Sequence, residues 1–278
     1  MDENENMSKN VGNAISSSQE EFIAQILKEK NLKYVNSEYV PVCPKQGMYA
    51  KYFKRVLDFI IAFLACIMVL PINLILAVCT YFDVGRPIIF RQTRIGKGGK
   101  EFQIIKFRNM TNDTDEHGNL LPASQRVTKF GKFVRKYSLD ELLNFWSVLK
   151  GDMAIIGPRP LPVFFGERFS ERHRMRSAVR PGLECPRVIR NDNMPKYHVQ
   201  FENDIWYVEH VSFRTDCYLV WQLVKMVFNK KYRETGAAGA SYFVGYDENG
   251  YATSMKKISR EHPEYVKQYE ERFIKGRS

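Results

Sequence analysis

A long apolar segment runs from Phe59 to Phe82 without a charged residue. As one continuous α-helix it would extend about 36 Å at about 1.5 Å per residue, enough to cross the hydrocarbon core of a bilayer. Pro71 stands in the middle of the run, where its missing N–H and its ring disfavour a straight helix. The pattern therefore predicts a membrane helix over residues 51–83 that is broken at Pro71.

Basic residues flank this segment on both sides. Lys54 and Arg55 precede it, and Arg86, Arg91 and Arg94 follow it closely. Because lysine and arginine mark the cytoplasmic side of membrane segments, both ends are predicted to lie on that side. A re-entrant helix-break-helix, supported by neighbouring protein at the break, is therefore favoured over a straight span. The alternative is a buried helical hairpin of a soluble protein, in which so long an uncharged run is unusual.

Shorter patterns predict a helix-rich α/β (α+β) domain over residues 84–233. Ile88–Gln92 and Phe102–Phe107 alternate like two strands around a glycine-rich turn. Leu139–Lys150 has the period of an amphipathic helix. Tyr218–Phe228 is strongly apolar on one side and is followed by basic residues, which is typical of a helix lying on a membrane surface.

The two ends of the chain are less regular. Residues 1–50 are polar and predict a loosely ordered arm with one short amphipathic helix around Phe22–Leu27. Residues 234–278 lose apolar periodicity and are expected to form a C-terminal tail or small appendage. The first residues lack a signal-peptide pattern, so the N-terminus is predicted to stay in the cytoplasm. Five scattered cysteines without a CxxC pair are typical of a reducing compartment.

The net charge of +11 predicts acidic partners: nucleic acid, anionic lipid or phosphorylated small molecules. A nucleic-acid-binding module would need aromatic residues interleaved with lysine and arginine on an exposed sheet, and it would not carry a long apolar run. The sequence also has no HExxH, no Cys/His metal spacing and no GxSxG, so zinc and serine hydrolase chemistry lack support. Anionic membrane lipid and phosphorylated small molecules remain as the acidic partners that the net charge predicts.

Two adjacent carboxylates, Asp140 and Glu141, are the strongest candidates for chemistry. Ser138 and Glu141 match a capping box at the start of a helix, and a plain capped helix is the alternative interpretation. That interpretation leaves Asp140 unexplained, one turn after Arg135. A carboxylate at a helix N-terminus beside cations is predicted to be ionised and able to attack phosphorus. The pair suits a nucleophile, Asp140, next to a Mg²⁺ ligand, Glu141.

Arg159 stands between two prolines, Pro158 and Pro160, directly after Gly157. The prolines fix the backbone on both sides of the arginine, and a guanidinium held in place is well suited to bind phosphate. An ordinary rigid surface loop is the alternative. The neighbouring carboxylate pair in the sequence favours a phosphate site.

Several blocks occur in a fixed order along the chain. They are Lys54-Arg55-x-x-Asp58, Phe90-x-Gln92-x-Arg94-x-Gly96, Lys106-Phe107-Arg108-x-Met110, Ser138-Leu139-Asp140-Glu141-Leu142, Gly151-Asp152-Met153, Gly157-Pro158-Arg159-Pro160 and Arg180-Pro181-Gly182. Together, from about Lys54 to Tyr232, the chain resembles the bacterial sugar transferases, also called monotopic phosphoglycosyl transferases. The resemblance implies a re-entrant membrane helix, a carboxylate pair with Mg²⁺ and ping-pong chemistry.

The resemblance also implies roles for individual residues. Asp140 would attack the sugar-linked phosphorus of a UDP-sugar and release UMP, and undecaprenyl (polyprenyl) phosphate would then take the phosphosugar. Glu141 would help to bind Mg²⁺. Contacts to phosphates or to the carboxylates are implied for Arg135, Pro158, Arg159, Pro160, Lys106 and Arg108, with Asp204 as a further candidate.

The expected setting is the cytoplasmic face of the bacterial inner membrane. The reaction would be the first membrane step of capsule, exopolysaccharide, O-antigen or glycoprotein glycan synthesis, with downstream glycosyltransferases or a second copy of the chain as partners. Gly182-Leu183-Glu184-Cys185-Pro186 departs from the Gly-Ile-Thr-Gly-Trp-like stretch usual in the family. This departure motivates an alternative, an inactive membrane-docked assembly or regulatory protein of the same fold, which the intact Asp140-Glu141 pair disfavours.

Overall fold

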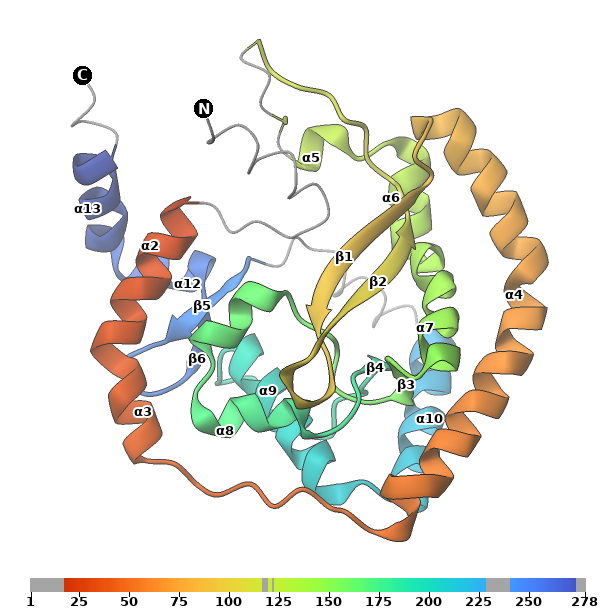
Figure 1. Cartoon of the computed structure of the whole chain (residues 1–278). Coiled ribbons are helices and arrows are strands. Elements are labelled where there is room, and N and C mark those ends of the chain that lie inside the picture. Colours follow the sequence, from red (N-terminus) through yellow and green to blue (C-terminus); the bar gives the residue numbers. More distant parts are fainter. Residues whose placement is uncertain (1–17, 117–119, 122, 229–240, 274–278) are drawn as a thin grey trace.

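The computed structural model describes residues 18–116, 120–121, 123–228 and 241–273. The chain begins with α2 (Ser18–Leu27), η1 (Lys28–Leu32), α3 (Lys33–Ser37), η2 (Tyr49–Phe53), α4 (Lys54–Val84), β1 (Ile89–Ile95), η3 (Lys97–Gly99), β2 (Glu101–Phe107), α5 (Ala123–Arg126), α6 (Lys129–Lys136), η4 (Leu139–Asn144) and α7 (Phe145–Lys150). It continues with β3 (Ala154–Ile156), η5 (Val163–Arg168), α8 (Glu171–Arg174), η6 (Met175–Ala178), β4 (Gly182–Glu184), α9 (Lys196–His210), α10 (Phe213–Phe228), β5 (Phe243–Tyr246), β6 (Ala252–Ser254), α12 (Met255–Glu261) and α13 (Pro263–Phe273). Short strands and helices lie between α4 on one side and α2 with the C-terminal elements on the other (Figure 1).

The helix α4 is long and apolar enough to cross a membrane, and only 11% of its most apolar window is buried inside the protein. Figure 1 shows it bowed along one side of the molecule. The helix continues through Pro71, so the predicted break at this residue is wrong. Pro71 removes one N–H from the helical ladder, and the long apolar runs on both sides keep the rest of the helix intact.

The start of α4 is fixed by buried polar groups. Lys54 Nζ lies 2.7 Å from Asp216 Oδ2 and 3.7 Å from Asp58 Oδ1. The backbone N–H of Ile155 in β3 donates to Asp58 Oδ1 over 3.1 Å, and the hydroxyl of Tyr49 donates to Asp216 over 2.6 Å. Because buried charges are costly unless they are paired, these contacts hold α4 in one position against β3 and α10.

Three pairs of strands form within the described residues. β1 and β2 are antiparallel, with Ile89 opposite Phe107 and Ile95 opposite Glu101, which confirms the predicted strands and their glycine-rich turn. β3 and β4 are parallel, and β5 and β6 are antiparallel. The helix-rich α/β prediction is therefore confirmed, with the sheets reduced to two-stranded pieces.

The segment predicted as one amphipathic helix over Leu139–Lys150 is instead the 3₁₀ turn η4 followed by α7. The predicted capping box is also wrong, since Ser138 has a left-handed backbone (φ 53°) and its side chain makes no capping hydrogen bond to any described residue. The Glu141 side chain meets Lys106 and Arg159 instead of the helix terminus. Side-chain pairing has thus replaced the local cap.

The helix predicted over Tyr218–Phe228 is confirmed as α10, which begins five positions earlier than expected, at Phe213. Its exposed side chains include Tyr218, Trp221 and Val224. The ammonium of Lys225 lies over the Trp221 ring, 5.1 Å from its centroid. An apolar face with a lysine beside it suits a membrane surface, because the long lysine side chain can carry its ammonium to the lipid headgroups.

The C-terminal residues are more ordered than the predicted tail. From Phe243 onward they form β5, β6, α12 and α13, and α2 packs against them. Ile23 and Leu27 of α2 are buried together with Val244, Ile258 and Tyr265. The predicted N-terminal arm is likewise helical from Ser18, while residues 1–17 and 234–240 lie outside the described part. Neither end shows clear periodicity over a long stretch because each supplies only part of a shared core.

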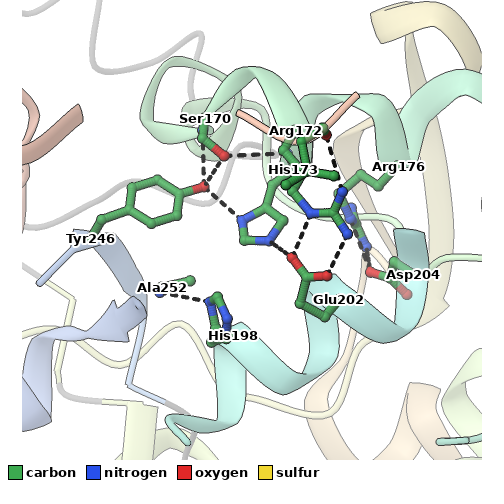
Figure 2. A network of polar contacts seen from close by, with 10 residues as sticks. Ser170, Arg172, His173, Arg176, His198, Glu202, Asp204, Tyr246 and Ala252 are labelled. Atoms are coloured by element: carbon green, nitrogen blue, oxygen red, sulfur yellow. Dashed lines mark hydrogen bonds and ion pairs between the residues drawn. The ribbon is translucent and has the colours of Figure 1, made fainter. Parts of the chain in front are cut away.

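A buried polar network connects this C-terminal hairpin to α8 and α9 (Figure 2). His173 Nδ1 lies 2.8 Å from the Tyr246 hydroxyl, and His173 Nε2 lies 2.9 Å from Glu202 Oε1. Arg172 pairs with the same Glu202 carboxylate over 2.7 Å. Burial lowers the pKa of His173, which keeps its ring neutral near pH 7. The network ties β5 to the central helices.

Candidate active site

Asp140 is the second residue of η4 and is buried, with 6% of its surface exposed. Its neighbours Leu139 and Leu142 pack against the apolar cluster that includes Phe107, which draws the aspartate inward. Asn109 Nδ2 donates a hydrogen bond of 3.1 Å to Asp140 Oδ2. Burial raises the pKa of Asp140, a shift opposite to the stabilisation of the ionised form that a helix N-terminus and cations would give. Loss of water outweighs the nearby cations, because η4 is a short 3₁₀ turn and not a long helix with a strong dipole.

Glu141 has the opposite electrostatics. Lys106 Nζ lies 2.5 Å from Glu141 Oε1, and Arg159 Nη2 lies 2.8 Å from the same oxygen. Although burial alone would raise it, these cations hold the pKa of Glu141 at about 2. Two adjacent carboxylates with pKa values displaced in opposite directions can take different chemical roles.

Arg159 is held in place from its own loop. Pro158 is buried and Arg159 is exposed, so the two prolines direct its guanidinium out of the core. The loop can approach β4 this closely because Gly182 has no Cβ. A Cβ at this position would lie only 2.1 Å from the Gly157 nitrogen. Arg159 Nη1 also lies 3.6 Å from Glu184 Oε2. The guanidinium therefore sits between two carboxylates.

Asn109 connects two further predicted residues to the site. Arg135 Nε donates to Asn109 Oδ1 over 3.0 Å, while the amide nitrogen of the same side chain reaches Asp140. Gly131 of α6 lies so close that a Cβ there would be 2.2 Å from the Asn109 carbonyl oxygen. Arg108 lies beside Asn109 in the chain and donates to the backbone carbonyl of Val84 at the end of α4. Arg135 thus acts on Asp140 through Asn109.

Asp204 does not face the carboxylate pair. It is buried in α9 and binds Arg176, whose Nη2 lies 2.5 Å from Asp204 Oδ2. The same Arg176 nitrogen donates to the backbone carbonyl of Arg159 over 2.9 Å. Asp204 therefore supports the loop of Arg159 from behind.

Most of the predicted residues converge on one place. Asp140, Glu141, Lys106, Arg159 and Arg135 are joined by the contacts above, either directly or through Asn109. The sequence analysis missed the side chains that support or surround them, which are Asn109, Arg176, Glu184 and Arg94. Burial lowers the pKa of Arg94 to about 10, with the positive Arg159 as the second cause.

Only part of this could have been found earlier. Asn109 was the unassigned position in the block Lys106-Phe107-Arg108-x-Met110, and Glu184 was noted only as a departure from the family pattern. Arg94 belonged to one of the blocks on which the resemblance rests, but no role was assigned to it. For Arg176 no signal in the sequence points to Arg159, because their contact depends on the packing of η6 against the loop.

The sequence from residue 49 to residue 230 matches the family model described as bacterial sugar transferase. The chain belongs to this family. The transferase is 37% identical over 194 residues to the uncharacterized sugar transferase EpsL of Bacillus subtilis, an alignment that covers 69% of this chain and 96% of that protein. The matched residues contain every element that builds the site.

Two further relatives carry names that state a reaction. The UDP-N-acetylgalactosamine-undecaprenyl-phosphate N-acetylgalactosaminephosphotransferase of Aeromonas hydrophila is 33% identical, over 63% of this chain and 44% of its own length. The UDP-glucose:undecaprenyl-phosphate glucose-1-phosphate transferase of Klebsiella pneumoniae is 34% identical, over 63% of this chain and 38% of its own length. The transferase therefore spans less than half the length of these two proteins.

The donor atoms of the site fit a hard divalent cation. Among the residues that the structure describes, no three His, Cys, Asp or Glu side chains gather as a metal site. Mg²⁺, however, is commonly held by one or two carboxylates together with substrate phosphates and water. Asp140 and Glu141 supply such carboxylates, and substrate phosphates would complete the set of ligands.

Proposed function

We propose that this transferase moves a sugar 1-phosphate from a UDP-sugar to undecaprenyl phosphate, giving a polyprenyl-diphosphate sugar and UMP. The observation that carries the proposal is the pairing of a buried Asp140 with a Glu141 that two cations keep ionised. The names of the Aeromonas and Klebsiella relatives support the same reaction class. The first covalent step is assigned to Asp140.

In the first step, a carboxylate oxygen of Asp140 attacks the phosphorus attached to the sugar. A phosphorus–oxygen bond forms to Asp140, the bond to the UMP oxygen breaks, and UMP leaves with the electron pair. In the second step, a phosphate oxygen of the acceptor attacks the same phosphorus, and Asp140 leaves as a free carboxylate. Burial favours this role, because a carboxylate with little water around it is a stronger nucleophile toward phosphorus.

The cations around Glu141 supply the charge compensation that phosphoryl transfer requires. Arg159 and Lys106 both contact Glu141 and are placed to meet the diphosphate of the donor. Arg135 holds the Asn109 side chain that orients Asp140. When bound, Mg²⁺ would be held by Glu141 with Asp140 nearby, and it would neutralise negative charge on the phosphates.

The membrane placement follows from how α4 is attached. Its start is bound to Asp216, and its last residues are bound to the same domain through Arg108 and through an Asp83–Thr128 hydrogen bond of 2.6 Å. A helix tied to one domain at both ends favours insertion into a single leaflet over a full crossing. We place it in the cytoplasmic leaflet of the inner membrane, because its flanks are basic.

The test is UMP release by protein in detergent or nanodiscs, with Mg²⁺ and a panel of UDP-sugars that includes UDP-glucose and UDP-N-acetylgalactosamine. Wild type should release UMP from at least one donor, and undecaprenyl phosphate should make the release continuous. Asp140→Asn should abolish it, whereas Asp192→Asn, the same change at an exposed position, should leave it intact. Silence of the wild type across the panel would favour the inactive docking protein, and full release by Asp140→Asn would remove Asp140 from the mechanism.

The place in glycan synthesis follows from the product. A polyprenyl-diphosphate sugar must be extended by enzymes that add further sugars at the membrane, so we propose that the transferase starts assembly of a surface polysaccharide or glycoprotein glycan. A relative named galactosyl transferase CpsE, from Streptococcus agalactiae, is 32% identical over 51% of this chain. Downstream glycosyltransferases and a second copy of the chain are the proposed protein partners.

A further inference from the structure

An apolar groove lies where the last turns of α4 meet the start of β1. Its volume is about 920 Å³, and its walls include Val78, Tyr81, Phe82, Arg86 and Ile89. Arg86 is its one charged lining residue, and the guanidinium of Arg86 lies 5.9 Å from the centroid of the Tyr81 ring. The groove is thus apolar along most of its length, with a cation within it.

The inner wall of the groove borders the candidate active site. Ala77 and Ile89 line the groove and also pack against the cluster of Leu76, Phe107 and Val134. Leu139 and Leu142 pack against the same cluster, immediately before Asp140 and immediately after Glu141. The groove and the segment that carries the carboxylate pair therefore border the same apolar cluster.

A second arginine lies close to the backbone that directly precedes Arg86. Arg108 donates to the carbonyl of Val84, and its guanidinium is 4.0 Å from the position of a Cβ on Gly85, directly before Arg86. Among the described residues, the buried Arg108 Nε has no hydrogen-bond partner. The next residue, Asn109, contacts Asp140. Arg108 therefore neighbours both the backbone before Arg86 and Asn109, the residue that contacts the nucleophile.

We propose that this groove holds the isoprenoid chain of the lipid acceptor, with the acceptor phosphate at Arg86 and Arg108. This inference rests on the proposed function. A single apolar chain that ends in a phosphate monoester matches a groove with apolar walls and two arginines at one end. The neighbouring face of α4, which exposes Val78 and Phe82, would let the chain enter sideways from the membrane. The free Nε of Arg108 would gain a partner on the phosphate.

The first test fills the groove. Val78→Trp places a large ring in it, and Ile61→Trp makes the matching change at an exposed position of α4 outside the groove. The KM for undecaprenyl phosphate should rise about tenfold in Val78→Trp, which corresponds to about 1.4 kcal/mol of lost acceptor binding. The KM for the UDP-sugar should stay at the wild-type value in both variants.

A second pair of variants covers the case in which the tryptophan prevents folding. Phe82→Ala removes an exposed ring from the groove wall, and Phe63→Ala removes an exposed ring elsewhere on α4. Only Phe82→Ala should raise the acceptor KM. Arg86→Gln should raise the same KM, with less effect of added salt than in wild type, because the lost contact is electrostatic.

The outcomes separate this inference from the proposed function. If wild type transfers no phosphosugar from any donor, the proposed function fails before the groove is tested. If wild type is active and the groove variants match their α4 controls in acceptor KM, the groove assignment is wrong. Binding of an ordinary phospholipid at this place would instead weaken attachment to vesicles in Val78→Trp while leaving acceptor KM unchanged, which also overturns the proposal.

Discussion

The hydroxyl of Tyr246 lies at the centre of a buried network, and Tyr246→Phe removes it alone. The hydroxyl accepts the Ser170 N–H over 2.9 Å, and it lies 3.0 Å from Ser170 Oγ and 2.8 Å from His173 Nδ1 (Figure 2). The Glu202 carboxylate beside His173 Nε2 favours a proton on that nitrogen, so the neutral ring accepts at Nδ1. Phenylalanine leaves this acceptor and the Ser170 N–H without a partner.

The expected cost follows from those groups. A buried polar group that loses its partner costs about 1–3 kcal/mol, and Tyr246→Phe strands two of them while the ring keeps its packing. We expect a loss of about 2–4 kcal/mol in the free energy of unfolding. For a chain of this size that corresponds to a fall of roughly 5–10 °C in Tm.

The assay is chemical and thermal unfolding of purified protein in detergent, with Tyr251→Phe as the matched control. Tyr251 also stacks on a histidine, His198, but its hydroxyl has no hydrogen bond among the described residues. Tyr251→Phe should change stability by less than about 0.5 kcal/mol. UMP release per folded molecule should be unchanged in both variants, since neither hydroxyl contacts Asp140. Equal stability of the two variants would refute the reasoning.

Four further predictions concern charges. Because the pKa of Asp140 is raised in the fold, its ionised form is disfavoured there, and Asp140→Asn should raise Tm at neutral pH while removing activity. The acid limb of UMP release should lie above pH 3.8, because Glu141 stays ionised down to about pH 2 and Asp140 sets the limb. Lys106→Met removes a cation that lowers the pKa of Asp140, so a pH profile should show the limb at higher pH. Asp204→Asn should lower the free energy of unfolding by about 2–4 kcal/mol in chemical unfolding, because the buried Arg176 loses its charged partner.

Local patterns predicted the β1–β2 hairpin, the helix α10 and three candidate site residues, Asp140, Glu141 and Arg159. The hairpin follows from alternation and a glycine-rich turn, which act between neighbouring residues. The grouping of Lys106, Glu141 and Arg159 followed from the resemblance to a family, and their contacts within 2.8 Å agree with it. Spacing alone could not bring Arg159 to Glu141, because the helix α7 and the strand β3 lie between them in the chain.

The remaining features depend on packing between distant segments. The direction of the Asp140 pKa shift reflects how much water the surrounding leucines exclude, which a sequence pattern does not measure. The low helix propensity of proline led to a predicted break at Pro71. The helix nevertheless continues through this residue, because the neighbouring turns retain their hydrogen bonds. Asp204 was a further candidate implied by the resemblance, and only the fold pairs it with Arg176.

The shared core of the two ends has a consequence for how the chain is made. The hydroxyls of Ser18 and Tyr269 are hydrogen-bonded although 251 positions separate them. During synthesis α2 leaves the ribosome long before β5 and α13 are made. The side chains of Ile23 and Leu27 therefore stay exposed to solvent while the catalytic residues are synthesised. Chains that stop before Phe243 keep this apolar helix exposed to proteases and chaperones. Synthesis of β5, α12 and α13 therefore buries the apolar face of α2, and truncated copies that lack them are exposed to degradation.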